Sequence, residues 1–392
     1  MPAAVPALIV TSVMPHPPTS GGHKRTLRLM EAIARAGATP HLLTVDGGQP
    51  GAADELRARD WLVDVAVAAP PSLGSRLGQQ AARRPGQYHS SVDRRLRELA
   101  PDAAFVQFEH PMNAYYWSAI GSTRSILSTH NVDSQVLLGS VRHARGLHRA
   151  RLTNRALAMR SAERRGARRS DAVLAVSEHD RSYFSRFSDR VLIASNGVDA
   201  DFFDVPAEMP DNHDVLFFAN YNYQPNADGI GRFLAEGWPR LAGLDQEARL
   251  LLAGPQMPDR LAAQADREVR VVRLGFVSDL SDLLRRSRVV LVPLWHGGGT
   301  RLKVLEALAS ARPVVGTPLG VEQIGVVNGR HAVIAQTPAA LADEVVELMA
   351  DPERSMALSG EGRALAETFR WERALEAAEQ LYRGWTAEGR TR

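Results

Sequence analysis

The residue pattern with the clearest chemical meaning is a run of glycines followed by basic side chains. The run reads Pro293-Leu294-Trp295-His296-Gly297-Gly298-Gly299-Thr300-Arg301-Leu302-Lys303. Consecutive glycines cost conformational entropy in an ordered chain, and they let backbone N–H groups come close to a ligand. The hydroxyl of Thr300, the guanidinium of Arg301 and the ammonium of Lys303 fall within one turn, which suits the spread charges of a diphosphate. The alternative is a glycine-rich turn with a solvated charged face. The run is neither a P-loop nor a metal-binding motif.

Glu306 follows this run about one helical turn further on. A carboxylate cannot bind phosphate, but it can accept two hydrogen bonds from the vicinal hydroxyls of a ribose, as the acid of dinucleotide-binding folds does. Cations for a diphosphate and an acid for a ribose make a consistent pair. The sequence therefore predicts a nucleotide site, and its residues are Gly298, Gly299, Thr300, Arg301, Lys303 and Glu306.

A second glycine cluster, Gly21-Gly22, lies between an apolar run and a segment with helical periodicity. Backbone N–H groups at a helix N-terminus, helped by glycine, can hold an anion. The spacing is not G-x-G-x-x-G, so a plain turn is the alternative. The chain has only two lysines, Lys24 and Lys303, and all the remaining residues of its Lys and Arg total are arginines. Each lysine lies beside a glycine cluster.

The elements that must position these residues are predicted from short apolar runs that alternate with helix-period segments, which is typical of an α/β protein with parallel strands. The predicted strands of the first half are Ala7–Thr11, His41–Val45, Val63–Ala68, Ala103–Phe108, Ser125–His130, Ala172–Ser177 and Val191–Ala194. Those of the second half are Val215–Ala219, Leu250–Ala253, Val269–Val272, Val289–Val292, Pro313–Thr317 and Ala332–Ala335. The first helix is expected over Lys24–Ala36, before Gly37.

A length of 392 residues favours two domains. The alternation breaks after Asn196-Gly197-Val198-Asp199, and the proline-bearing segment Asp201–Asn212 is predicted to be the linker. The predicted domains are residues 1–200 and residues 212–370. Ala364–Trp385 reads as helical, and residues 371–392 could pack back on the N-terminal domain as a C-terminal helix. Two doubly wound, Rossmann-like parallel sheets are expected to face a cleft, with ligands at the carboxyl ends of the strands.

Composition excludes several classes of protein. The chain has 23% charged and 44% apolar residues and no cysteine, so it is expected to be globular, without disulfides or thiolate metal sites. The N-terminus lacks the pattern of a signal peptide, and no stretch reaches the ~20 apolar residues that span a bilayer. These features favour a cytoplasmic protein, with a peripheral place at the inner membrane surface as a further option.

Arginines are concentrated between Arg142 and Arg169, where the lone acid is Glu163. Such a segment is often a solvated helix face. It could instead be a basic surface for an anionic partner, either a membrane leaflet or a phosphorylated acceptor. Nucleic acid is less favoured, because the segment lacks interleaved aromatic residues.

With these residues in view, the chain resembles the GT-B glycosyltransferases, in particular those of glycosyltransferase family 4 (group 1), over nearly its whole length. The likeness rests on motifs whose order and spacing together are specific. They are Gly21-Gly22, Ser128-Thr129-His130-Asn131-Val132, Val176-Ser177-Glu178-His179-Asp180, Asn196-Gly197-Val198-Asp199, Gln224-Pro225-Asn226, Gly275-Phe276-Val277, and the stretch from Gly297 to Pro313-Val314-Val315.

The resemblance implies roles for several of these residues. Glu306 would bind the ribose, the backbone from Gly298 to Arg301 would lie near the diphosphate and sugar, and Gly275, Phe276 and Val277 would border the base. The Gly21 and Gly22 amides would close onto the diphosphate from the other side, and His130 would touch the donor sugar. The first domain, residues 1–200, would present the acceptor, and the second, residues 212–370, would bind the nucleotide sugar.

Two departures from the family pattern bear on the donor. The family often has two acids separated by seven residues, and Gly298 stands where the first acid would be. A basic pair that often follows the first strand of the second domain is also missing, because residues 219–226 contain no Arg or Lys. Arg301 and Lys303 are the candidates to replace it, and the identity of the donor sugar stays open.

Sugar transfer needs stabilisation of the leaving diphosphate and a route for the acceptor proton. The resemblance favours retention of configuration, in which the donor's own phosphate oxygen takes the proton and His130 only positions. Inversion would need a base, and His23 or Glu109 could serve. No cofactor and no metal are expected, since there is no Asp-x-Asp motif and Arg301, Lys303 and the loop amides could offset the charge.

The predicted reaction is transfer of a sugar, most plausibly a hexose, from a nucleotide diphosphate donor to a small-molecule, lipid-linked or glycan acceptor. Two alternatives remain open at this point: a nucleotide-sugar epimerase of the same fold, and a non-catalytic nucleotide-sugar binding protein. An epimerase would need carboxylates aimed at the sugar ring, and the glycines at 297–299 argue against them.

Overall fold

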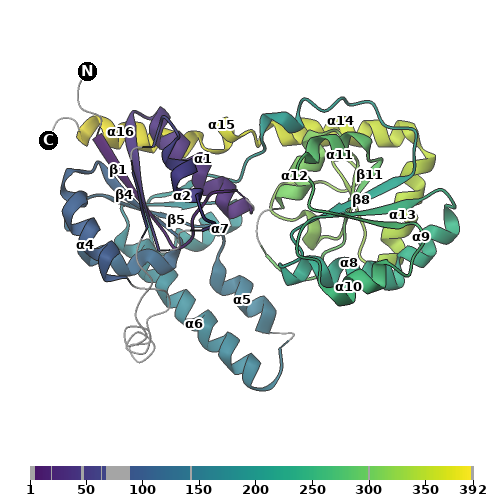
Figure 1. The fold of residues 1–392 in the computed structure, drawn as a ribbon, viewed down its shortest axis with the longest axis horizontal. Helices are drawn as coiled ribbons and strands as arrows, with labels where there is room; N and C mark the ends of the chain where they lie inside the picture. Colours follow the sequence, from purple (N-terminus) through teal and green to yellow (C-terminus); the bar gives the residue numbers. More distant parts are fainter. Residues whose placement is uncertain are drawn as a thin grey trace. The chain divides into compact units, whose positions relative to one another are not determined.

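The computed structural model describes residues 5–18, 20–45, 48–62, 64–67, 89–141, 144–298 and 301–389. The chain folds into two compact units (Figure 1). Unit 1 comprises the chain up to Asn196 and again from Ala374, and unit 2 is Gly197–Arg373. Gly299, Thr300 and Arg142 of the predicted sites lie outside the described residues. Each unit is a doubly wound α/β structure around one parallel sheet, as the sequence predicts.

The sheet of unit 1 has, within the described residues, the strand order β3-β2-β1-β4-β5-β6-β7, and all its pairs are parallel. Its strands are β1 Val5–Thr11, β2 Ala38–Thr44, β3 Asp64–Val67, β4 Phe105–Glu109, β5 Ser125–Ser128, β6 Ala172–Ala175 and β7 Val191–Ile193. The central strands are buried on both faces, which explains why they read as apolar runs rather than as an alternating pattern.

Helices cover both faces of this sheet (Figure 1). They are α1 Gly21–Arg35, α2 Ala52–Arg57, α4 Ser90–Leu99, α5 Asp133–Val141, α6 Gly146–Arg169, α7 Glu178–Phe184 and α16 Glu376–Gly389, with the 3-10 turns η1 Ala100–Asp102 and η2 Pro111–Ala119. The C-terminal helix α16 belongs to this unit, where the Tyr382 ring stacks on Phe105 at 5.2 Å and its hydroxyl donates to Oε1 of Gln107 at 2.6 Å.

The sheet of unit 2 has, in the part of the chain that is described, the order β10-β9-β8-β11-β12-β13, again parallel throughout. Its strands are β8 Asp214–Phe218, β9 Arg249–Ala253, β10 Val271–Gly275, β11 Val289–Val292, β12 Val314–Gly316 and β13 Val333–Ile334. Its helices are α8 Gln224–Glu236, α9 Trp238–Leu244, α10 Asp259–Ala265, α11 Leu280–Arg286, α12 Leu302–Ala309, α13 Pro338–Ala350 and α14 Pro352–Glu367, with η3 Ala200–Phe202 and η4 Leu319–Val321. The short helix α15 Trp371–Ala374 ends at the boundary.

Each strand order reverses direction at one place. In unit 1 this switch point lies between β1 and β4, and in unit 2 it lies between β8 and β11. The loops at the carboxyl ends of these strand pairs diverge to opposite faces of the sheet, which opens a crevice there. Both glycine clusters follow a switch-point strand, since Gly21-Gly22 comes after β1 and Gly297-Gly298 comes after β11.

Some predicted boundaries are wrong. Helix α1 begins at Gly21 rather than Lys24, because Ser20 caps it by accepting a hydrogen bond from the His23 N–H at 3.2 Å. Strand β10 starts two residues later than predicted, and Val269 before it is 99% exposed. β10 is an edge strand with a mostly exposed face, so its apolar pattern is weak.

The single helix predicted over Ala364–Trp385 is in fact divided among α14, α15 and α16. It breaks where the N–H of Val198 donates to the carbonyl oxygen of Phe369 at 2.8 Å. The segment predicted as a linker is also structured, because Phe202, Phe203 and Val205 are buried in unit 2. The turn η3 places these apolar side chains against the sheet, an arrangement that its two prolines did not suggest.

Candidate donor site and its relatives

The glycine loop of unit 2 is held by a tyrosine from the start of α8. The hydroxyl of Tyr223 accepts a hydrogen bond from the Gly298 N–H at 2.9 Å and donates one to the Gly298 carbonyl oxygen at 3.2 Å. Gly297 has a φ of +111°, and a Cβ atom there would lie 2.7 Å from the Tyr223 hydroxyl and 2.9 Å from Pro225. The need for glycine at position 297 therefore comes from packing within the protein as well as from backbone conformation.

Lys303 lies in the first turn of α12 and contacts the same segment. Its Nζ atom donates a hydrogen bond to Oδ1 of Asn226 at 2.8 Å and lies 4.8 Å from the centre of the Phe217 ring. The amide of Asn226 in turn donates to the carbonyl oxygen of Asn220 at 2.8 Å. The structure thus brings together the glycine run and the Gln224-Pro225-Asn226 motif, which are far apart in the sequence.

The electrostatic environment of Lys303 disfavours its charge. Burial lowers its pKa to about 7, the positive charge of Arg301 acts in the same direction, and Glu306 opposes both. A neutral or easily deprotonated amine next to a glycine loop is poised to gain a proton when an anion arrives, because a nearby negative charge favours the ammonium form. Glu306 itself is only 8% exposed and lies three residues further along α12, on the same helix face.

Arg301, which the sequence predicts as a diphosphate ligand, forms three hydrogen bonds within the protein. Its side chain is 4% exposed, and its three nitrogens donate to Leu319 O at 2.9 Å, Gly298 O at 3.0 Å and Glu322 Oε1 at 3.0 Å. The guanidinium therefore ties the glycine loop to η4. Its positive charge still acts on the site, and three of its five N–H groups are bonded within the protein.

The segment predicted to border the base follows β10. Gly275 has a φ of +66°, Phe276 is 72% exposed, and Val277 packs on the core of unit 2. An aromatic ring this exposed, held between an αL glycine and a half-buried valine, offers a flat apolar face next to the carboxyl end of the sheet.

A buried polar cluster lies at the switch point of unit 1. Glu109 is the last residue of β4 and is 0% exposed. Its Oε2 lies 2.8 Å from Nε2 of His130 and accepts a hydrogen bond from the Ser128 hydroxyl at 3.2 Å. Its Oε1 accepts one from Nε2 of Gln107 at 2.6 Å. The carboxylate is thus enclosed by donors from β4 and β5.

Burial alone would raise the pKa of Glu109, but the hydrogen bond and charge of His130, the charge of Arg25 and the hydrogen bond from Gln107 outweigh it, so this pKa lies below its ordinary value. An ionised carboxylate only accepts hydrogen bonds. Nε2 of His130 therefore carries a proton, and Nδ1 is the nitrogen that accepts a hydrogen bond whenever the ring is neutral.

Gly22 lies against this acceptor atom. A Cβ atom at position 22 would come within 3.1 Å of His130 Nδ1. The first N–H groups of α1, which have no partner inside the helix, therefore begin next to the imidazole. His23 lies in the same turn, half-buried, and its backbone rather than its ring forms the bond to Ser20. The structure brings together Gly22, Glu109 and His130, which the sequence singled out separately.

Sequence reasoning missed His110 and Arg25. The His110 ring stacks on His130 with 4.0 Å between ring centres, and its φ of 69° is strained for a non-glycine residue. Burial and the neighbouring His130 charge lower the pKa of His110 to about 3, so this ring is neutral. Arg25 is fully buried and donates to the carbonyl oxygens of Ala194 and Ser195. A histidine directly after the predicted strand-end acid, and an arginine in the Gly-Gly-His-Lys-Arg run, were the available signals.

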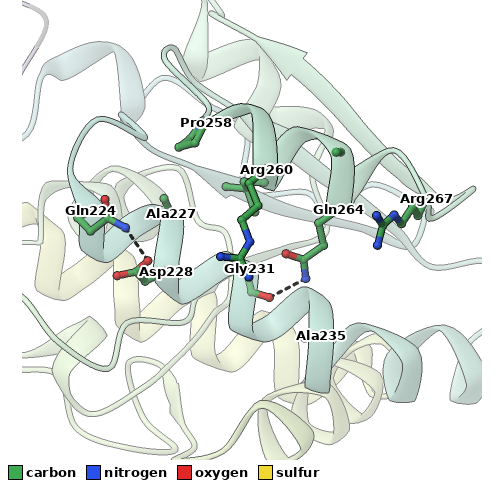
Figure 2. A pocket seen from close by; sticks show the side chains of 11 residues that line it. Gln224, Ala227, Asp228, Gly231, Ala235, Pro258, Arg260, Gln264 and Arg267 are labelled. Carbon is green, nitrogen blue, oxygen red and sulfur yellow. Dashed lines mark hydrogen bonds between the residues drawn. The ribbon is translucent and has the colours of Figure 1, made fainter. Parts of the chain in front are cut away.

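A cavity of about 670 Å³ lies between α8 and α10 of unit 2 (Figure 2). Gln224, Asp228, Arg260, Gln264 and Arg267 line it, and in the close view Arg260 extends from α10 toward α8. None of the predicted donor residues lines this cavity. Within the described residues, no group of three or more His, Cys, Asp or Glu side chains could hold a metal ion.

Two families match the chain, one in each half. The family described as Glycosyltransferase Family 4 matches residues 19–202, and the family described as Glycosyl transferases group 1 matches residues 212–351. D-inositol 3-phosphate glycosyltransferase of Corynebacterium urealyticum is 28% identical over 156 residues, which are 39% of this chain and 35% of that protein. The matched stretch thus spans about a third of the length of that relative.

Solved structures share the fold over nearly the whole chain. Anabaena HepE in complex with UDP and glucose has a TM-score of 0.68 at 15% identity, covering 98% of this chain and 100% of that one. Sucrose-phosphate synthase from Thermosynechococcus elongatus has a TM-score of 0.69 at 18% identity, with 98% and 100% coverage. WaaG, a glycosyltransferase involved in lipopolysaccharide biosynthesis, has a TM-score of 0.68 at 15% identity, with 96% and 99% coverage. The two parallel-sheet units and these matches show that the chain belongs to the GT-B glycosyltransferases. Its first half is of the Family 4 type and its second half of the group 1 type.

Proposed function

We propose that this chain transfers a sugar from a nucleotide diphosphate donor to an acceptor hydroxyl, and that unit 2 binds the donor. The observation that carries the proposal is the contact of Lys303 with Asn226 beside the Tyr223-held glycine loop. This places a buried amine at the carboxyl ends of β8 and β11, where open α/β sheets bind ligands. The family matched by this half of the chain supports the same reading.

In this proposal, different residues of unit 2 bind different parts of the donor. Lys303 offsets charge on the diphosphate, and the backbone of the glycine loop approaches it. Glu306 accepts hydrogen bonds from the ribose hydroxyls, and Phe276 offers its ring to the base. Arg301 acts as a support that fixes the loop, because its donors are bonded to Leu319, Gly298 and Glu322. UDP is a suitable first probe, since Anabaena HepE was solved with UDP and glucose.

In unit 1 we assign His130 the role of accepting a hydrogen bond from a substrate hydroxyl through Nδ1. Glu109 is a positioning residue, because its buried carboxylate holds the Nε2 proton and contacts no solvent. The role of general base considered for Glu109 would require access to the acceptor, which its burial does not offer. His23, exposed in part on the first turn of α1, keeps that role as an alternative under inversion.

We propose that the reaction retains the anomeric configuration and proceeds without a metal ion or other cofactor. The bond from the anomeric carbon to the diphosphate oxygen breaks, the bond to the acceptor oxygen forms, and the acceptor proton passes to an oxygen of the leaving diphosphate. The support for retention is the family match, together with the burial of Glu109, which keeps this carboxylate from acting as the general base that inversion would need. The support for metal independence is the amine of Lys303, which can offset charge at that place.

The test is incubation of the protein with a panel of nucleotide sugars and candidate acceptors, followed by mass spectrometry and NMR of the products. Transfer, or slow donor hydrolysis without an acceptor, supports the proposal. Conversion of the donor into an isomeric sugar would refute it, and so would binding without turnover across the panel. The anomeric coupling constant of the product decides between retention and inversion, and activity that survives EDTA supports metal independence.

A further inference from the structure

The helices α5 and α6 pack side by side on unit 1, and Figure 1 shows both helices extending beyond the strands of that unit. We define the Arg–Leu hairpin as α5 together with α6 and its N-cap residue Arg145. Helix α6 is 24 residues long, and most of its N-terminal half is exposed. Among the described residues no helix is both long enough and apolar enough to cross a bilayer, so this hairpin is not a membrane span.

The exposed surface of the hairpin is strongly basic. Its exposed arginines are Arg145, Arg149, Arg151, Arg155, Arg160, Arg165, Arg168 and Arg169. The lone acid of α6, Glu163, does not offset them at the surface, because it is 0% exposed. Glu163 accepts hydrogen bonds from the backbone and hydroxyl of Ser134 at 2.8 and 2.6 Å and from the Tyr183 hydroxyl at 2.8 Å. The acid thus joins α5, α6 and α7 internally, and the solvent-facing charge is cationic.

Large apolar side chains lie among these arginines. Leu147 is 80% exposed, Leu157 is 57% exposed, and Leu138 on α5 is 40% exposed. At three- or four-residue steps, Leu147, Arg151, Asn154 and Leu157 fall on one stripe of α6. Leucines beside long arginine stems suit the boundary of a bilayer, where the leucines and the aliphatic stems enter the acyl region while the guanidinium groups stay with the phosphates.

A small cavity of about 110 Å³ adjoins the C-terminal half of α6. Arg165 and Arg169 line it together with Tyr115 and Trp117 of η2. Two guanidinium groups beside aromatic rings match the chemistry of a phosphate attached to a glycerol or sugar. The charge, the exposed leucines and this cavity all point to the same kind of partner.

We propose that the Arg–Leu hairpin binds the anionic headgroups of a lipid bilayer and holds the protein at that surface. Guanidinium groups supply long-range attraction to anionic lipid, and the leucines supply contact that salt does not screen. A nucleic acid is less well matched, because α6 carries no aromatic residue on which bases could stack. The inference uses the surface of unit 1 only, so it does not depend on which sugar the protein transfers.

The experiment is sedimentation of the full chain with vesicles of phosphatidylcholine alone and of equal parts phosphatidylcholine and phosphatidylglycerol. We expect binding to the anionic vesicles to be stronger by about tenfold or more, and to weaken with added salt. A triple variant with Arg149→Gln, Arg151→Gln and Arg155→Gln should lose about tenfold in vesicle affinity. A matched triple variant on unit 2, with Arg260→Gln, Arg267→Gln and Arg285→Gln, has the same net charge and should bind as the wild type does.

A second variant, Leu147→Ala with Leu157→Ala, tests the apolar contact at exposed positions where folding is not at stake. It should lower the binding that persists at high salt. Circular dichroism and UDP binding measured on each variant separate a folding defect from a surface effect. Equal binding to neutral and anionic vesicles would overturn the proposal, as would equal losses in the two triple variants, or displacement of the protein from vesicles by equimolar duplex RNA.

Discussion

Nε2 of His130 lies 2.8 Å from Oε2 of Glu109, whose side chain is 0% exposed. This buried pair fixes which imidazole nitrogen carries the proton, and it turns the other nitrogen toward Gly22. The arrangement follows from topology, since β4 ends in Glu109 and its neighbour β5 leads directly into His130. A side chain from each of two adjacent strands therefore meets at the carboxyl edge of the sheet.

Replacing Glu109 by Gln should lower kcat by about tenfold or more, because the amide preserves the shape but no longer selects the tautomer of His130. Binding of UDP, assigned to unit 2, should stay the same. Steady-state kinetics and calorimetry measure the two effects separately. The control is Glu178→Gln, a change of equal charge at an exposed carboxylate. A Glu109→Gln enzyme with unaltered kcat would remove the positioning role.

Gly22→Ala should reduce turnover as well, since its Cβ atom would press on His130 Nδ1 at 3.1 Å. The ring must then move by a few tenths of an ångström, away from the position that its bond to Glu109 sets. Gly139→Ala in α5 is the matched control, because a Cβ atom there meets nothing within 4 Å. Equal activity of the two variants would show that the contact does not matter to the reaction.

Glu306→Ala should weaken UDP binding by about 1–3 kcal/mol through the loss of hydrogen bonds to the ribose. Isothermal titration calorimetry measures this directly. The exposed acid Glu353, also in unit 2, provides the control variant Glu353→Ala, which should bind as the wild type does. Unchanged affinity in the Glu306 variant would contradict the ribose assignment.

Nucleotide binding should depend on pH through Lys303. The unliganded amine has a pKa of about 7 because it is desolvated and lies near Arg301. A diphosphate raises that pKa, so binding takes up a proton, and affinity falls as the pH rises from about 7 to about 9. Calorimetry in buffers of different ionisation enthalpy detects the proton. Lys303→Met should bind less tightly at about pH 7 and lose this slope, whereas Lys24→Met should retain it; a slope that survives in Lys303→Met would disprove the prediction.

Gly229→Ala should destabilise the protein even though the position is helical. Alanine normally stabilises a helix by about 1 kcal/mol relative to glycine. Here the new Cβ atom would lie 2.1 Å from the carbonyl oxygen of Pro293, so α8 must move away from the loop after β11. We expect a net loss of roughly 2 kcal/mol or more in the free energy of unfolding. Gly243→Ala, with open space around it, should be neutral or stabilising in the same denaturant titration.

The fold was accessible from the sequence because buried parallel strands leave a strong local signal. All residues of Val289–Val292 are buried, and such runs mark the strands whatever their neighbours are. The edge strand β10 lacks that signal, which explains its shifted start. Position in the chain also put both glycine clusters after predicted strands, and the strand orders identify these as switch-point strands.

The partners of the site residues were not accessible in the same way. Tyr223 and Pro225 lie more than seventy positions before Gly297, and nothing local in the sequence indicates that they confine it. The sequence suggested a phosphate ligand in Arg301, but nothing local in it indicates that Leu319 and Glu322 accept hydrogen bonds from this side chain. Likewise, the burial of Glu109 depends on contacts from β5, which is paired with β4 only in the folded sheet. Residue types could suggest the chemistry, while three-dimensional neighbours decide which groups remain available for it.

The meeting of Val198 with Phe369, and of Trp371 Nε1 with Asp199 Oδ1 at 3.0 Å, places the entry and exit of unit 2 next to each other. When the two ends of an inserted domain lie next to each other, that domain can be replaced by another without changing the conformation of the domain that carries it. Recombination at the two boundaries would replace residues 197–373 with the corresponding domain of a relative, while α16 remains packed on unit 1. Under the proposed function, in which unit 2 binds the donor, such an exchange would change donor preference while the sheet of unit 1 stays the same.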